Sequence, residues 1–185
     1  MKRFSAGMGL YIFLLIPSVV NWMESIMIVH MFLQLPLLIV SGVFVGKTMI
    51  RPFSRLFSNW NANGVPCIMI AVFMTTYWML PRAMDEALSD PYVEWFKFVS
   101  LPLVGICIVD SWKKLNGIGK GFLFFNYLPM FGLMAWLYID SPVQVCNYYL
   151  TTEQRVLGWG FAFITCCMIF YIIQYVFTDH LKKAD

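Results

Sequence analysis

The sequence contains six apolar stretches, each long enough to cross a lipid bilayer as an α-helix. A spanning helix needs about 20 mostly apolar residues, and the segments between these stretches are short and polar. No linker is long enough to divide the chain, so we expect a single polytopic membrane domain over residues 1–185. The expected spans are Phe4 to Trp22, Ser25 to Val45, Gly64 to Leu80, Val93 to Val109, Gly121 to Tyr138 and Val156 to Phe177.

The composition supports an all-α integral membrane protein. Hydrophobic residues make up 60% of the chain and charged residues 12%, whereas ordinary domains carry about 25% charge. A soluble domain of 185 residues cannot cover that much apolar surface. The net charge of +3 and the lack of a basic run interleaved with aromatic residues argue against nucleic acid as a partner.

Basic residues between the spans predict the orientation of the bundle. Ten of the thirteen Lys and Arg residues fall before the first span or after the second, fourth and sixth spans. Cytoplasmic loops carry such an excess of Lys and Arg. We therefore expect about six spans with both termini in the cytoplasm, in the plasma membrane of a bacterium or archaeon. In this topology Cys146 lies in an outward loop, where we expect it to be accessible to reagents.

The familiar catalytic motifs are missing from the sequence. It contains no GxSxG, no phosphate-binding glycine loop and no HExxH. The two histidines, His30 and His180, lie at depths that differ by on the order of 20 Å, so they cannot ligate one haem or one metal. We therefore do not expect an enzyme.

One helix face near the outer end of the second span carries soft metal-ligand chemistry. Met27, His30 and Met31 share this face with Gln34 because they are spaced three or four residues apart. Met79 reaches a similar depth from the third span. Thioether and imidazole groups suit Cu(I), which makes copper a candidate ligand. The alternative is that these residues pack without metal, because Met is a common filler of apolar cores.

Two further patterns allow simple structural interpretations. Lys97 and Glu94 lie near the start of the fourth span, where we expect Lys97 to extend to the outer surface and pair with Glu94.

Gly42 and Gly46 form a GxxxG face, which permits close approach of another helix. We expect that face to contact a partner protein.

Several segments, in order, resemble the polytopic CtaG-like family of cytochrome c oxidase assembly proteins. The resemblance covers most of the chain from Glu24 onward. It rests on the run from His30 to Pro36, on Trp78-Met79-Leu80-Pro81 followed by Asp85 and Ala87-Leu88, on Gly105 and Trp112, and on Glu153-Gln154 with Gly158. Met79 stands where that family carries a histidine, and its histidines early in the fourth span are missing here. The resemblance implies a helical bundle and a copper role on His30, Met31, Met79 and Glu153.

These observations lead to one expected function and one alternative. The expected function is a non-catalytic accessory or assembly subunit of a membrane-bound metalloenzyme, such as a copper oxidase or monooxygenase. Its partners would be the lipid bilayer and a larger membrane-protein complex. The alternative is a small copper-handling protein or transporter with a metal site near the outer face, formed by Met27, His30, Met31, Met79 and Glu153.

Overall fold

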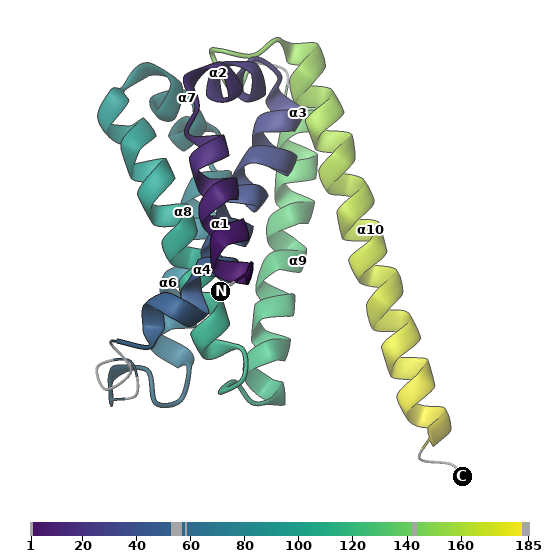
Figure 1. The fold of residues 1–185 in the computed structure, drawn as a ribbon. Coiled ribbons are helices and arrows are strands. Elements are labelled where there is room, and N and C mark those ends of the chain that lie inside the picture. Colours follow the sequence, from purple (N-terminus) through teal and green to yellow (C-terminus); the bar gives the residue numbers. More distant parts are fainter. Residues whose placement is uncertain (1, 53–56, 58, 142–143, 183–185) are drawn as a thin grey trace.

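The chain folds into a bundle of α-helices, shown by a computed structural model that describes residues 2–52, 57, 59–141 and 144–182 (Figure 1). The described residues contain no strand. In chain order the elements are α1 (Lys2–Leu14), α2 (Pro17–Glu24), α3 (Met27–Val29), the π-helix η1 (His30–Gln34), α4 (Leu35–Ile50), α6 (Val65–Met79), α7 (Pro81–Ser89), α8 (Pro91–Ser111), α9 (Gly117–Asp140) and α10 (Thr151–Lys182).

Within the described residues, four helical segments are long and apolar enough to cross a membrane. They are Met27–Ile50, Pro91–Ser111, Gly117–Asp140 and Thr151–Thr178. Two bent pairs pass the same test together: α1 with α2, bent by 70°, and α6 with α7, bent by 75°. The all-helical class is therefore confirmed, and the described residues contain four candidate membrane spans, or up to six if each bent pair is one span.

Prolines cause both bends. Pro17 and Pro81 open α2 and α7, and the residue before each proline is extended, with φ −65° and ψ 124° at Ile16 and φ −71° and ψ 133° at Leu80. Proline disfavours the helical conformation in the residue that precedes it. The expected span from Phe4 to Trp22 is therefore broken: α1 ends at Leu14, and only the bent pair of α1 and α2 has the length of a span.

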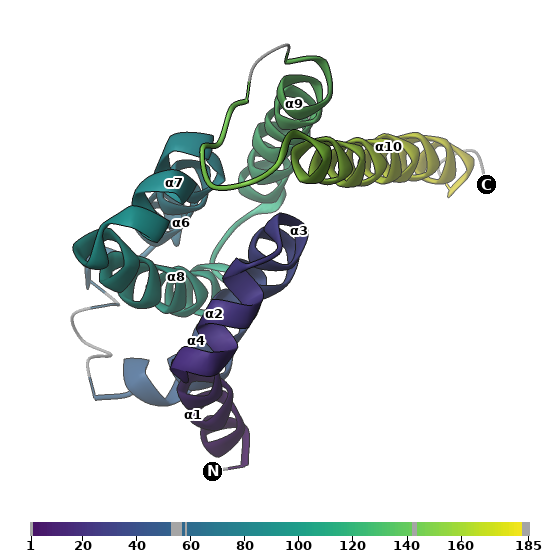
Figure 2. The same ribbon diagram turned by 90° about the horizontal axis from the view of Figure 1, so that it is seen from above.

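The helices form two groups. In the first, α4 packs along α8, which also contacts α6, while α1 packs against α4. The second group is the hairpin of α9 and α10, which meets the first group through α3 and α6 (Figure 2). Helices α2 and α7 lie across one end of the bundle, beside the segment that connects α9 to α10 (Figure 1). We call this the capped end. The first turn of α1 and the last turn of α10 lie toward the opposite end.

Glycines bring the backbones of α4 and α8 into contact. A Cβ added at Gly42 would lie 2.0 Å from the carbonyl oxygen of Pro102, and one at Gly105 would lie 2.1 Å from that of Ile39. Gly46 faces Ile106 at 3.2 Å in the same way. The Gly42 and Gly46 face is thus occupied within the chain, and the expectation that it contacts a partner protein is wrong.

A second contact between helices follows from Pro102. This proline lies inside α8 and has no N–H, so the carbonyl of Phe98, four residues earlier, loses its usual helical donor. The hydroxyl of Tyr11 on α1 donates to that carbonyl at 3.1 Å. Neighbouring helices commonly satisfy carbonyls freed by proline inside membranes.

Adding a methyl group at the α4–α8 contact should destabilise the bundle. We expect Gly42→Ala and Gly105→Ala to lower the midpoint of thermal unfolding in detergent, because the new Cβ meets backbone atoms that cannot move aside. Gly9→Ala is the matched control, since nothing lies within 4 Å of a Cβ at that position. Equal midpoints for Gly42→Ala and Gly9→Ala would contradict the close packing.

Candidate functional site

A buried polar network lies at the capped end. It joins Glu24, at the end of α2, to side chains from η1, from α8 and from the segment between α9 and α10. The members are Glu24, His30, Gln34, Lys97 and Tyr149. Of these, His30, Gln34 and Lys97 are fully buried, so the network lies inside an otherwise apolar bundle.

Lys97 forms an ion pair with Glu24. Its ammonium group contacts Oε1 of Glu24, and the ring of Phe98 lies 4.8 Å from the same nitrogen. The expectation that Lys97 reaches the outer surface and pairs with Glu94 is therefore wrong. The reason is the bend at Pro17, which turns α2 across the end of the bundle and brings Glu24 over the inward face of α8.

His30 is held in one tautomer by Tyr149. The Tyr149 hydroxyl donates to the backbone oxygen of Glu24 at 2.7 Å, and the same hydroxyl lies 2.9 Å from Nδ1 of His30. Because the hydroxyl has one proton, it must accept from Nδ1–H of a neutral His30. Burial, with a contribution from Glu24, raises the pKa of Tyr149, so the phenol keeps its proton.

This assignment leaves two buried acceptor atoms without a donor. Nε2 of His30 carries a lone pair, and Oε1 of Gln34 has no hydrogen-bond partner among the described residues. The amide nitrogen of Gln34 donates to Glu24 at 3.3 Å. Buried acceptors are normally satisfied by protein, water or a bound ion, and both atoms belong to η1.

The π-helical turn itself has a local cause. Pro36 has no N–H to bond four residues back, and the amide of Leu35 bonds to the oxygen of His30, five residues back. The wider turn buries His30, Met31 and Gln34. π-helical turns often mark functional sites in helices.

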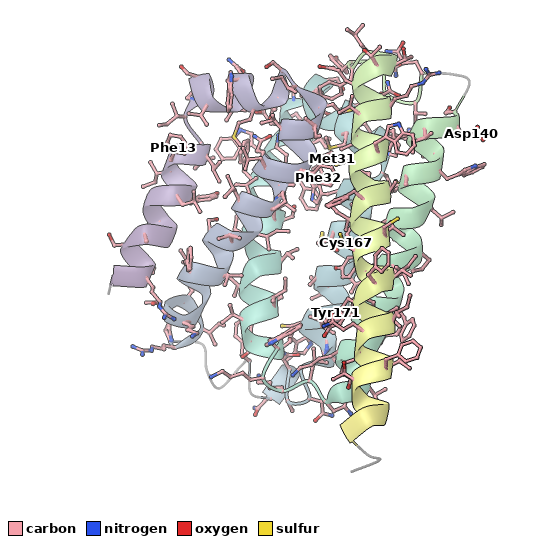
Figure 3. All side chains as sticks on the ribbon, turned by 90° about the vertical axis from the view of Figure 1, so that its right-hand side faces the viewer. Phe13, Met31, Phe32, Asp140, Cys167 and Tyr171 are labelled. Carbon is pink, nitrogen blue, oxygen red and sulfur yellow. The ribbon has the colours of Figure 1, made fainter. Side chains whose placement is uncertain are left out.

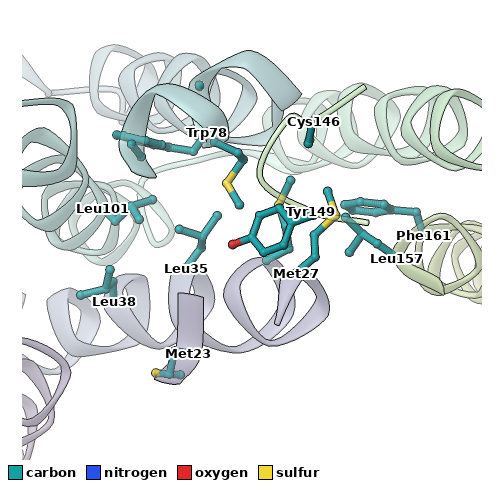
Figure 4. Close-up of a cluster of buried hydrophobic side chains, with 14 of the residues drawn as sticks. Met23, Met27, Leu35, Leu38, Trp78, Leu101, Cys146, Tyr149, Leu157 and Phe161 are labelled. Atoms are coloured by element: carbon teal, nitrogen blue, oxygen red, sulfur yellow. The ribbon is translucent and has the colours of Figure 1, made fainter. Parts of the chain in front are cut away.

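The segment between α9 and α10 is fixed by Gln154. Its side-chain amide donates to the oxygens of Cys146 and Tyr149 at 3.0 and 2.9 Å, and its own oxygen accepts from the amide of Val145 at 3.0 Å. Asp85 on α7 accepts from the backbone and side chain of Asn147 at 2.8 and 3.0 Å. These bonds hold Tyr149 in a cluster of buried hydrophobic side chains that also contains Met27 and Phe161 (Figure 4).

The predicted copper ligands are only partly brought together. Met27 and Met31 are buried in one cluster with Met79 packed against it, and His30 lies between them in the chain with Nε2 free of hydrogen bonds. This donor set suits Cu(I). Glu153 lies half-buried in the first turn of α10, and its neighbour Gln154 makes the contacts of that turn. The copper site stays a prediction.

A second feature is an apolar cavity of about 570 Å³ between the two groups of helices. Helices α4, α6 and α8 supply one side, and α9 and α10 supply the other. Figure 3 shows two of its lining residues, Met31 and Phe32, beside α10. Thr75 and Tyr127 add polar groups to the wall, but their hydroxyls bond to each other at 2.7 Å. The cavity therefore suits an apolar occupant.

Removing one partner of the Lys97–Glu24 pair should be more harmful than removing both. We expect Glu24→Gln to destabilise the protein by about 3–5 kcal/mol, because it strands a buried ammonium group. The double variant Glu24→Gln, Lys97→Met should recover much of that loss in thermal unfolding in detergent. Arg82→Gln, which breaks the exposed Arg82–Glu86 pair, is the control and should change little. A double variant no more stable than Glu24→Gln would contradict the buried pair.

The CtaG-like resemblance stays a likeness of short segments. The comparisons find no matching family model, no matching curated protein and no matching solved structure.

Proposed function

We propose that the chain crosses the membrane six times, with both termini in the cytoplasm. In this topology α1 and α6 each cross once, while α2 and α7 lie along the outer surface. The acidic residues Glu24, Asp85 and Glu86 belong to α2 and α7, and the opposite end carries Lys47 at the end of α4 and Lys114 after α8. The excess of basic residues on the cytoplasmic side of membrane proteins supports this orientation.

Thiol labelling of intact cells tests the topology. In a variant without Cys166 and Cys167, a cysteine at the exposed position Ser89 should react with an impermeant maleimide, whereas one at Lys114 should react only after permeabilisation. Labelling of position 114 from outside would overturn the six-span orientation.

Labelling of the native Cys146 does not report the topology well in the same experiment. It is fully buried, so the expectation that it is accessible is wrong. Burial, together with Asp85, raises the pKa of its thiol to about 12. Since the thiolate is the reactive form, labelling of Cys146 should be slow at neutral pH and should accelerate as the pH rises toward that value.

We propose that the protein is a non-catalytic accessory or assembly subunit of a membrane-bound metalloenzyme. The observation that carries the proposal is the contrast between the polar network at the capped end and the apolar cavity between the two groups of helices. The capped end is locked by the ion pair of Lys97 with Glu24, and the remainder encloses an apolar cavity. Transporters place ionisable groups and broken helices near the midplane, whereas this arrangement suits a protein that binds other molecules within the membrane.

The outer face of α10 is the surface that we propose for a protein partner. Trp159, Phe163, Phe170 and Phe177 are all exposed, and their spacing of four and seven residues places them on one face of the helix. Aromatic residues are enriched where proteins bind one another. The CtaG-like resemblance supports a copper oxidase or monooxygenase as the partner class.

Photo-crosslinking from this face tests the proposed function. A photoreactive phenylalanine analogue at Phe170 should crosslink the chain, in its native membranes, to a metalloenzyme subunit. The same analogue at Ile12, exposed on α1, is the control and should not. Loss of the chain should lower the metal content of that enzyme. Crosslinking only to lipid, with unchanged metal content, would overturn the proposal.

A copper-handling protein is the second candidate, favoured by the free Nε2 of His30 beside two buried methionines. After anaerobic loading with Cu(I) and removal of loose metal, the wild type should then retain about one copper per chain. The double variant His30→Ala, Met31→Leu should lose it, while Met8→Leu, in exposed α1, should not. Equal retention in all three proteins would reject this candidate.

A further inference from the structure

The cavity between the two groups of helices runs along the bundle, from Met31 and Met79 near the capped end to Trp112 and Lys120 near the opposite end. On α9 its wall runs from Lys120 to Phe131, and on α6 from Ile68 to Met79. Each distance is eleven residues, or about 16 Å along a helix. Each of these walls alone covers about half of the roughly 30 Å hydrocarbon core of a bilayer, so the cavity is long enough to hold an acyl chain.

The wall of the cavity offers little to a polar ligand. Aliphatic and aromatic side chains form most of it, and the hydroxyls of Thr75 and Tyr127 are bonded to each other. The volume of about 570 Å³ lies within the range of sites that hold one small molecule, about 300–1,000 Å³. A hydrocarbon chain satisfies this lining and leaves no polar group unpaired.

A cation lies at the surface end of the cavity. Lys120 and Trp112 both line it there, with the ammonium nitrogen 5.3 Å from the centre of the indole ring. Among the described residues Lys120 forms no ion pair, whereas the nearby Lys114 pairs with Asp110 at 2.7 Å. The ammonium group of Lys120 is therefore free to pair with an anionic group from the membrane.

An adjoining cleft extends the apolar space. It has a volume of about 440 Å³ and lies between α9 and α10. Phe124, Ile164 and Met168 line both the cleft and the cavity. Two connected apolar spaces next to one cation match a molecule with two hydrocarbon chains and an anionic headgroup.

We propose that this cavity binds one anionic phospholipid, with its acyl chains in the cavity and the adjoining cleft and its phosphate at Lys120. Basic pockets between membrane helices are known to bind anionic headgroups. The proposal goes beyond the accessory function and needs no protein partner. It requires only that Lys120 lies at a membrane surface, so it can hold or fail independently of the crosslinking experiment.

Native mass spectrometry of the full chain tests the site. The protein is reconstituted in bilayers of equal phosphatidylglycerol and phosphatidylcholine, extracted in mild detergent and weighed with its bound lipid. Wild type should retain one phosphatidylglycerol per chain, several-fold in preference to phosphatidylcholine. Lys120→Gln should abolish this preference. Lys113→Gln is the matched control, because Lys113 lies in the same segment but does not line the cavity, and it should behave as wild type.

Two cavity-filling variants separate the cavity from the general lipid surface. Ala71→Phe on α6 and Ile164→Trp on α10 fill the space from opposite walls, and each should reduce retention of both lipids. If one of them fails to fold, the other decides. Wild type without bound lipid or without preference, equal effects of Lys113→Gln and Lys120→Gln, or full retention in a folded cavity-filling variant would each overturn the proposal.

Discussion

The arrangement of the helices at the capped end depends on the ion pair between Lys97 and Glu24. An ammonium group buried among apolar helices carries a large desolvation cost unless an opposite charge meets it. Meeting it requires Glu24 to lie over α8, which in turn requires α1 to end early and α2 to cross the end of the bundle. The backbone oxygen of Glu24 then orients Tyr149, which fixes the tautomer of His30.

Local sequence patterns predicted the helices better than they predicted the contacts between them. Apolar length predicted the helical class, whereas the breaks before Pro17 and Pro81 were not predicted, since Pro102 and Pro129 lie inside continuous helices. Sequence spacing predicts that Lys97 pairs with Glu94, the nearest carboxylate on the same helix. The actual partner, Glu24, is 73 residues away, and only the fold brings it close. Gln154 was passed over in favour of Glu153, since sequence alone does not tell which of two neighbours points inward.

The capped end and the walls of the cavity differ in how many polar groups they contain. At the capped end, side chains from four segments bind one another, so movement of one segment disturbs the others. Between α4 and the hairpin of α9 and α10, the side chains are apolar and enclose space. The polar network at the capped end therefore specifies the fold, whereas the apolar cavity is available for binding.

The early end of α1 has a consequence for the surrounding bilayer. With 13 residues, α1 spans about 20 Å, whereas α10 with 32 residues spans about 48 Å. In the proposed six-span topology the protein is therefore thin beside α1 and thick beside α10. Lipids beside α1 would have to compress, and hydrophobic mismatch of this kind sorts membrane proteins laterally. A protein with one short flank lowers the free energy of this mismatch when it lies where the bilayer is already thin, or beside proteins with equally short spans.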